Sequence, residues 1–255
     1  MNLDTKVIPE IFEPLTISAR QVLGKVSSDD LTKMAAAGAE VQRCTAVLAR
    51  TNANPVGEIL RHSEGFYEWS HYPEDDVYDP ETHSQYYYHT HPPETRPWGE
   101  HGHFHIFVRR EGMPAGIDPS LAVLPPNTGD SLCHLVAISM DDFGRPVRLF
   151  TTNRWVTGET WYAAHNVIAI LPYFNVDVVR PNWVVNRWLT ALVRLFQPQI
   201  AELIQRRDHA IAEWKGVHPY SDVFEDRNLE VTSQVEVDVD EQLETVQKML
   251  RDRKA

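Results

Sequence analysis

The sequence predicts an α+β protein, in which a central, mainly antiparallel sheet or barrel is flanked by N-terminal and C-terminal helices. Apolar residues have helical spacing near the start, strand-like alternation in the middle, and helical spacing again after Pro181. A chain of 255 residues, 42% of them hydrophobic, is large enough for one sizeable core. We therefore expect a single domain over residues 1–255 with three parts: a helical lead-in (1–57), a sheet core with a histidine site (58–180), and a helical C-terminal part with one late strand (181–255).

The helical lead-in is predicted over residues 8–51. Ser28, followed by two aspartates, offers an N-cap before apolar residues at roughly helical spacing. Residues 58–72 fit no single pattern. We interpret residues 73–80 as an acidic, solvated loop, although carboxylates so near the histidines could also lend a ligand; they are Glu74, Asp75, Asp76 and Asp79.

Strand patterns dominate the middle of the chain. Residues 101–109 alternate well, and residues 132–140 are apolar on both faces. A turn over residues 141–146 and a return strand over residues 147–152 indicate a hairpin. Residues 159–174 are apolar and aromatic enough to supply one or two further strands.

The C-terminal part returns to helical spacing. Residues 184–196 carry one apolar stripe, and a second helix is predicted from Pro198 to about Trp214. Residues 231–239 alternate valine with polar residues, which is typical of a half-exposed strand. Asp240 is expected to cap a final charged helix.

Composition and charge exclude several classes of protein. The formal net charge is −12, and no run of Lys and Arg would overcome the repulsion of a phosphate backbone, so we expect no nucleic-acid partner. No apolar run reaches the roughly 18 residues of a membrane span, and the first residues lack a secretory pattern. We expect a cytoplasmic protein with a small-molecule substrate and no membrane partner. The sequence leaves the oligomeric state open.

Histidines are concentrated in one short segment. Six of the 12 lie within residues 83–105. In a strand, side chains two residues apart share a face, so the odd-numbered face of residues 101–109 carries imidazoles while the even-numbered face is apolar. Residues 86–91 follow the same parity. The clustered histidines are His83, His89, His91, His101, His103 and His105.

These two segments are predicted to pair across a loop of residues 92–100. If His91 lies opposite His101, then His89 faces His103 and Tyr87 faces His105. The same register pairs apolar residues on the other face, and a slip by one residue would send histidines into the core. A loop rich in Pro and Gly could also carry the segments to different sheets. The apolar pairs are Tyr88 with Phe104 and Tyr86 with Ile106.

A transition metal ion is the expected cofactor, because neutral imidazoles are the usual ligands of Fe, Cu and Zn. With only Cys44 and Cys133 in the chain, the ligands must be nitrogen and oxygen atoms. Five histidines exceed the need of one catalytic ion, so some are second-sphere residues or there are two ions. His83 is a peripheral candidate. The candidate ligands are His89, His91, His101, His103 and His105.

Three further residues are candidates for catalysis. Glu94 and Glu100, in the connecting loop, could complete the coordination sphere, orient a ligand or move protons. Tyr87 lies on the histidine face, although cross-strand packing is its simpler interpretation. Outside the cluster, His134 and His165 are interpreted as core histidines with satisfied hydrogen bonds. Arg187 and Arg194 are interpreted as part of a solvated helix face.

Three resemblances accompany these patterns. Residues 86–109 and 134–161, the latter including His-Leu-Val-Ala-Ile-Ser-Met, resemble a bacterial family of unknown function, which implies no activity. Residues 101–107 (His-Gly-His-Phe-His-Ile-Phe) are similar to the histidine-triad motif of nucleotide hydrolases and transferases, which implies attack on phosphorus by His103. That family has an apolar residue where Gly102 stands. Residues 89–94 resemble the first motif of cupins, with a shortened spacing to Glu94 and without the glycine framing.

The sequence therefore predicts a metal-dependent enzyme that acts on a small molecule. Oxidative chemistry at iron or copper is preferred to zinc-type hydrolysis, because the ligands are all nitrogen and the surroundings are aromatic, with residues 86–88, Trp98 and Phe107. Two alternatives stay open. One is a histidine-triad nucleotide hydrolase or transferase that uses His103, and the other is a metal-storage or metal-sensing protein without catalysis.

Overall fold

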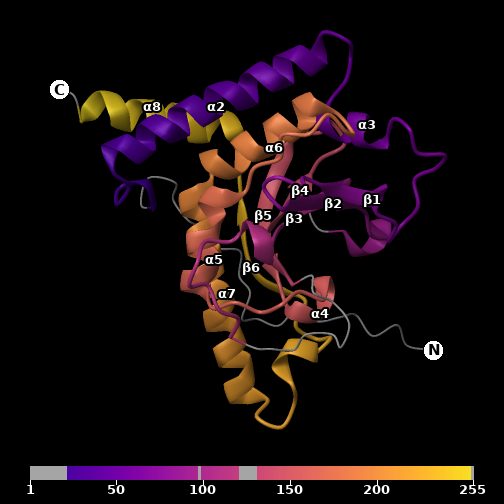
Figure 1. The fold of residues 1–255 in the computed structure, drawn as a ribbon, viewed down its shortest axis with the longest axis vertical. Helices are drawn as coiled ribbons and strands as arrows, with labels where there is room; N and C mark the ends of the chain where they lie inside the picture. The colour runs from indigo at the N-terminus through magenta and orange to yellow at the C-terminus, as the bar shows by residue number, and fades with distance from the viewer. Residues whose placement is uncertain (1–21, 97–98, 121–130, 254–255) are drawn as a thin grey trace.

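The protein is built on one open six-stranded antiparallel sheet, with its strands in the order of the chain. We describe it from a computed structural model, which defines residues 22–96, 99–120 and 131–253. Each strand pairs with the next, and β1 and β6 form the two edges, so the sheet does not close into a barrel (Figure 1). The strands are β1 (Tyr72–Tyr78), β2 (Ser84–His89), β3 (Gly102–Arg109), β4 (Leu132–Met140), β5 (Pro146–Thr152) and β6 (Val231–Glu236).

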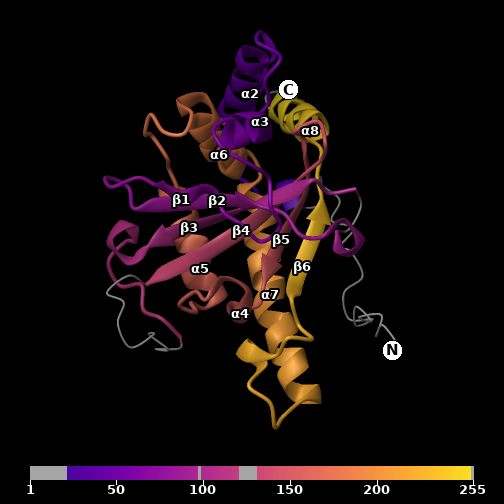
Figure 2. The ribbon, with the colours of Figure 1, turned by 90° about the vertical axis from the view of Figure 1, so that its right-hand side faces the viewer.

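Helices pack against one face of this sheet. In Figure 2 the strands lie in front of α5 and α7, and α2 and α8 lie together at one end. The predicted α+β class is therefore confirmed. The helices are α2 (Ser28–Ala49), α3 (Pro55–Leu60), α4 (Arg154–Thr157), α5 (Ala164–Ile170), α6 (Trp183–Leu195), α7 (Gln197–Val217) and α8 (Val239–Asp252), and the 3-10 turns are η1 (Pro93–Thr95), η2 (Arg110–Gly112), η3 (Leu171–Tyr173) and η4 (Val223–Glu225).

The hydrophobic core lies between the helices and the even-numbered face of β2 and β3. The Phe104 ring lies 6.4 Å from the ring of Trp188 on α6, and the hydroxyl of Tyr86 donates a hydrogen bond to Asn186 on the same helix. Each such buried aromatic ring stabilises the fold by roughly 1.5–3 kcal/mol. Tyr88 and Ile106 complete this face, as the alternation in the sequence predicts.

The terminal helices also follow the sequence pattern. The buried side of α2 packs against α6 and α8, as expected. The prediction that Ser28 caps this helix is wrong by one residue, because the Ser27 side chain accepts the hydrogen bond from the amide of Asp30. The predicted helix over residues 8–21 lies outside the described residues. The prediction that Asp240 caps the last helix is wrong, because Asp238 accepts the hydrogen bond from the amide of Glu241.

The acidic segment 73–80 is not the predicted loop, because most of it is strand β1. Only Tyr72 and Val77 of this strand are buried, since it lies at the edge of the sheet and exposes Glu74 and Asp75. Between these two residues the register to β2 shifts, so β1 contains a bulge. Charged edge strands of this kind lack the apolar alternation by which strands are predicted.

The strands predicted over residues 159–174 are also wrong. Residues from this range form the short helix α5 and the 3-10 turn η3. Val167, Ile170 and Leu171 are buried, at a spacing that suits one side of a helix. Seven residues are too few for helical periodicity to stand out in a segment so rich in apolar residues.

Candidate metal centre

The hairpin β2–β3 carries the site on the face opposite the helices. His89 lies opposite His103 and Tyr87 opposite His105, which confirms the register that the sequence predicts. β2 ends at His89, so the predicted pair of His91 with His101 lies beyond the strand pairing. There the hydroxyl of Thr90 donates a hydrogen bond to the carbonyl of His101 at 2.7 Å.

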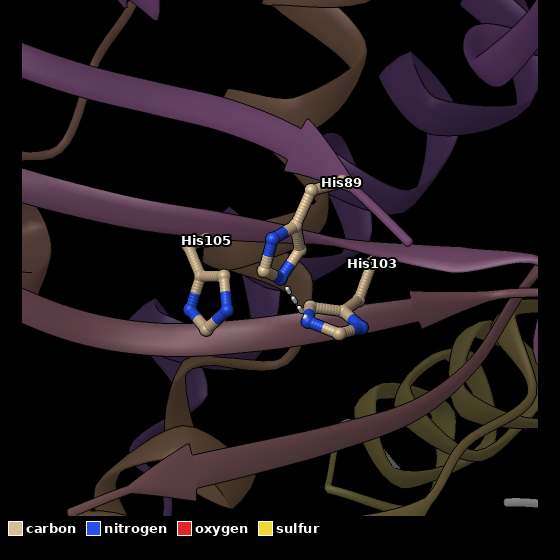
Figure 3. A group of neighbouring side chains, drawn as sticks. All are labelled: His89, His103 and His105. Carbon is tan, nitrogen blue, oxygen red and sulfur yellow. Dashed lines mark hydrogen bonds between the residues drawn. The ribbon is translucent and has the colours of Figure 1, made fainter. Parts of the chain in front are cut away.

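Three histidines on this face converge on one buried point. One nitrogen atom from each of His89, His103 and His105 lies within 4.8 Å of the others, and Nε2 of His89 lies 2.7 Å from Nε2 of His103 (Figure 3). The three side chains come from two paired strands, whose backbone hydrogen bonds fix their spacing. Their residues are 8%, 3% and 1% exposed, respectively, so water competes little for these nitrogen atoms.

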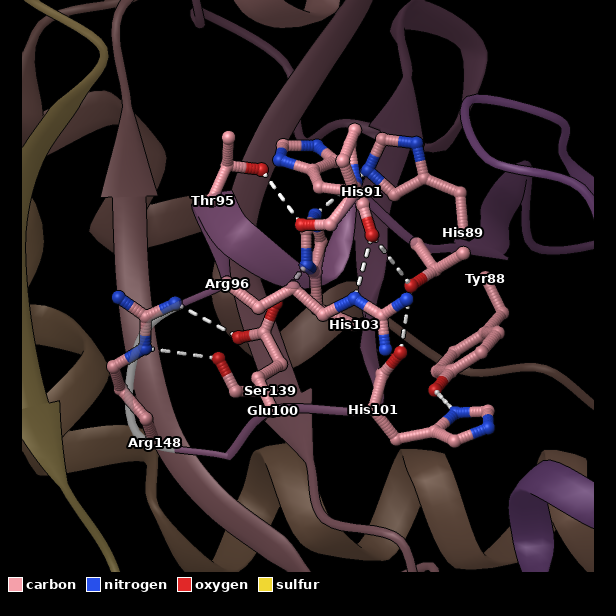
Figure 4. A network of polar contacts seen from close by, with 12 residues as sticks. Tyr88, His89, His91, Thr95, Arg96, Glu100, His101, His103, Ser139 and Arg148 are labelled. Carbon is pink, nitrogen blue, oxygen red and sulfur yellow. Dashed lines mark hydrogen bonds and ion pairs between the residues drawn. The ribbon is translucent and has the colours of Figure 1, made fainter.

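A carboxylate orients the second of these rings. Oε1 of Glu100 accepts a hydrogen bond from Nδ1 of His103 at 2.7 Å, and Oε2 lies 2.8 Å from Nη2 of Arg148 (Figure 4). Nε of Arg148 in turn donates to the hydroxyl of Ser139 at 2.9 Å. Because the proton of His103 lies on Nδ1, the neutral ring presents the lone pair of Nε2. Ligating histidines usually donate their other ring N–H to a carboxylate, a backbone carbonyl or water, and Glu100 is such a partner.

The third ring has an unsatisfied atom. Nδ1 of His105 and Nε2 of His134 share a hydrogen bond of 3.0 Å, whereas the buried Nε2 of His105 has no hydrogen-bond partner among the described residues. Leaving such an atom unpaired is costly. A metal ion bound to Nε2 of His105 would satisfy it, so the residues present fit a metal ion.

Burial keeps His89, His91 and His105 neutral. Burial is the largest cause that lowers the pKa of His89 to about 2 and the pKa of His91 to about 4. Burial likewise holds the pKa of His105 well below its ordinary value. Burial alone would raise the pKa of Glu100, but His103 and Arg148 outweigh it and the pKa is lowered. The rings of His89, His91 and His105 are therefore neutral and can offer a nitrogen lone pair to a metal ion, close to the ionised carboxylate of Glu100.

The two remaining histidines of the hairpin differ in position. The ring of His91 lies 5.0 Å from the rings of both His89 and His103 and stacks on Trp69 at 4.3 Å, so it borders the triad. The ring of His101 turns toward the core face, where Nδ1 lies 2.7 Å from the hydroxyl of Tyr88 (Figure 4). His101 is therefore not brought to the triad.

The candidate catalytic residues are also separated. Glu100 lies within the site, as described above, whereas Glu94 is exposed on η1. The buried ring of Tyr87 lies 5.2 Å from the ring of His105. His83 lies away from the triad, with Nδ1 2.6 Å from the hydroxyl of Tyr78. Trp98 lies outside the described residues.

The other histidine and arginine expectations have mixed outcomes. His165 is exposed on α5, so its interpretation as a core histidine is wrong. His134 is buried as expected, with hydrogen bonds to His105 and, at 3.4 Å, to Thr152. Arg194 is exposed, whereas Arg187 is only partly exposed and lies 3.3 Å from Glu40 on α2.

Several residues near the triad carried no signal that the sequence patterns could detect. A bulge in β4, opposite Ile106 and Phe107, shifts the register between β3 and β4 and brings His134 opposite Phe107 on the histidine face. Arg148 lies close to the site because Ser139 of β4 pairs with His103 of β3 on one side and with Arg148 of β5 on the other. A buried carboxyl group, Glu159, accepts a hydrogen bond from the amide of His134 at 2.8 Å. Only the register of three strands could have revealed these contacts.

The fold and the site define an α+β protein with a buried histidine triad that could bind a metal ion. The model of a family described as a domain of unknown function (DUF6969) matches residues 35–237. The chain belongs to this family, in agreement with the resemblance seen in its sequence. Neither the comparison with curated proteins nor the comparison with solved structures found a match. None of the helices in the described residues is long and apolar enough to cross a membrane.

Proposed function

We propose that the protein is a metal-dependent enzyme acting on a small molecule, with an ion held by His89, His103 and His105. The observation that carries the proposal is the convergence of three buried imidazoles, with two Nε2 atoms 2.7 Å apart and the third without a partner among the described residues. Neutral imidazoles suit zinc, copper and iron. Three protein ligands leave a coordination position open, as in catalytic rather than structural sites.

The surrounding residues would orient the metal ligands and keep water away from the open coordination position. Glu100 holds the proton of His103 on Nδ1, and Arg148 pairs with the other oxygen of the carboxylate. The rings of Tyr87 and Phe150 lie 5.2 Å from His105 and 5.1 Å from His103, respectively, and exclude water. When bound, a transition metal ion would supply Lewis acidity or one-electron chemistry.

We favour oxidative chemistry at iron or copper over zinc-type hydrolysis. The all-nitrogen ligand set and the aromatic lining support this choice. A storage or sensing protein would bind the ion without turnover. A histidine-triad transferase would need Nε2 of His103 as a free nucleophile, and the close approach of His89 to that atom supports metal binding instead.

Elemental analysis of protein purified without chelators tests the proposal. The wild type should hold, or take up, Fe²⁺, Cu²⁺ or Zn²⁺, and a His89→Ala, His103→Ala double variant should not. His165→Ala, which removes an exposed histidine on α5, is the matched control and should bind like the wild type. A correctly folded wild type that takes up none of these ions would refute the proposal.

A second set of measurements separates the functions. Dioxygen consumption by the iron-loaded or copper-loaded protein with a panel of small phenols, thiols and amines should exceed that of the double variant. Turnover only by the zinc-loaded protein on ester or amide substrates would indicate hydrolysis. Binding without any turnover would indicate storage, and a phosphoramidate trapped on His103 would indicate the transferase.

A further inference from the structure

His71 lies beside the triad, on the side of His89 away from His103. Tyr72 of β1 pairs with Tyr88 of β2, so the next step of the antiparallel register places His71 beside His89. The ring of His71 stacks flat on Tyr87, with centroids 3.6 Å apart and 8° between the planes. It meets the ring of His89 at an edge, with centroids 6.1 Å apart.

A carboxylate orients His71 as Glu100 orients His103. Oδ1 of Asp76 lies 2.8 Å from Nδ1 of His71, and Oδ2 accepts a hydrogen bond from Nε2 of Gln85 at 2.6 Å. Nε of Arg109 donates to Oε1 of Gln85 at 2.7 Å. Since a carboxylate only accepts hydrogen bonds, the ring proton lies on Nδ1, and Nε2 of the neutral ring is an acceptor.

The backbone of β1 is shaped to make this contact. Asp76 lies within the bulge and has a φ of +55°, a conformation uncommon for residues other than glycine. Such conformations cost energy and persist where the surroundings fix them, often at functional sites. The side chain of Asp76 is 17% exposed, whereas that of His71 is 40% exposed. The carboxylate is therefore fixed while the imidazole stays accessible.

We propose that His71 contacts the substrate, with Nε2 accepting a hydrogen bond from a hydroxyl or amino group. The inference rests on the proposed metal function, because the other end of the substrate would bind the ion. The ring centroids of His71 and His89 lie 6.1 Å apart, and a chain of four covalent bonds of roughly 1.5 Å spans about 5 Å, so a molecule of this length could reach from the ion to His71. The carboxylate of Asp76 disfavours an anionic group here, so the substrate carries a hydrogen-bond donor about four bonds from its metal-binding atom.

Three hydroxamates of equal length test this inference in calorimetric titrations of the Zn²⁺-loaded full chain. Butanohydroxamate ends in a methyl group, 3-hydroxypropanohydroxamate in a hydroxyl group and 3-aminopropanohydroxamate in an amino group. In the wild type, the hydroxyl or the amino probe should bind about 3- to 10-fold more tightly than the methyl probe. His71→Phe, which keeps a ring to stack on Tyr87, should abolish this preference without loss of zinc.

His101→Phe is the matched control, because Nδ1 of His101 is also hydrogen-bonded and its ring also stacks flat on an aromatic ring, that of Phe66. It should keep the preference. Asp76→Asn provides a second variant if His71→Phe does not fold, and it should reduce the preference. Equal binding of the three probes to the wild type, or an unchanged preference in a folded His71 variant, would overturn the role of His71 and leave the metal site standing. Failure to take up zinc at all would instead refute the proposed function and this inference with it.

Discussion

Glu100 joins His103 to Arg148, accepting a hydrogen bond at 2.7 Å from the imidazole on one oxygen atom and pairing at 2.8 Å with the guanidinium on the other. Glu100→Gln should therefore weaken metal binding by about 10- to 100-fold, since it removes the charge that polarises His103 and turns an amide toward Arg148. Competition with a chromophoric chelator measures the change. Glu94→Gln, at an exposed position, should leave the affinity unchanged. Equal affinities in both variants would argue against the role of Glu100.

Metal removal should lower the stability of the protein, because an ion that binds only the folded chain stabilises it. At a free ion concentration of 100 times Kd, the gain is about 2.7 kcal/mol. Urea unfolding of the loaded protein, before and after treatment with a chelator, measures the difference. His105→Ala should unfold at the same midpoint under both conditions. A chelator that leaves the wild-type midpoint unchanged would contradict the prediction.

Acid should destabilise the metal-free protein before most carboxylates titrate. The pKa of His91 is lowered to about 4 and that of His134 to about 3, chiefly by burial, so the unfolded chain binds protons more readily than the folded protein. This contribution to stability is present above a pH of about 6.5 and is lost as the pH falls toward the lowered values. Unfolding free energies at intervals from pH 7 to pH 4 test this. A flat profile over that range would be inconsistent with it.

The titration of Glu159 should have the opposite effect on stability and lower it as the pH rises. Burial raises its pKa to about 7, so its contribution to stability is present below the ordinary pKa of about 4.5 and is lost as the pH rises through 7. Glu159→Gln stays neutral, and its amide oxygen can still accept the hydrogen bond from the amide of His134. The variant should therefore gain stability relative to the wild type between pH 5 and pH 8. Thermal unfolding at both values gives the comparison, and a constant difference would show that the carboxyl group does not titrate there.

Gly102→Ala should destabilise the hairpin by about 1–3 kcal/mol. An added Cβ would lie 2.5 Å from the carbonyl oxygen of His89 and 2.6 Å from the hydroxyl of Tyr88, so β2 and β3 would have to separate. Gly216→Ala is the control, because nothing lies within 4 Å of its added Cβ. Denaturant unfolding of both variants measures the effect. A Gly102→Ala protein as stable as the control would mean that the strands yield without cost.

Periodicity sufficed to predict the hairpin that carries the triad. Its two faces differ so strongly that only one register buries Tyr88 and Phe104 while pairing His89 with His103. The ends of the strands were less predictable. Parity alone assigned His101 to the histidine face, but the residue precedes β3, and its ring turns to Tyr88.

The outer residues of the site could not be predicted because bulges determine their positions. A bulge in β4 places His134 beside His105, and a bulge in β1 turns Asp76 toward His71. An extra residue in one strand depends on contacts between strands, and the local sequence carries no clear mark of it. The acidic composition of residues 73–80 also led to a wrong prediction, because it is typical of a loop, whereas Asp76 belongs to strand β1.

The hairpin β2–β3 separates folding from chemistry by residue parity. Even-numbered side chains such as Phe104 hold the helices, whereas odd-numbered side chains such as His103 and His105 form the site. The metal ligands can therefore change without a change of fold: Tyr87→Glu or His105→Asp would alter the set of ligands while leaving the surface that packs against the helices intact. In evolution, and equally in protein engineering, the side chains at alternate positions of this hairpin can be substituted to change the site while the hairpin keeps its place in the fold.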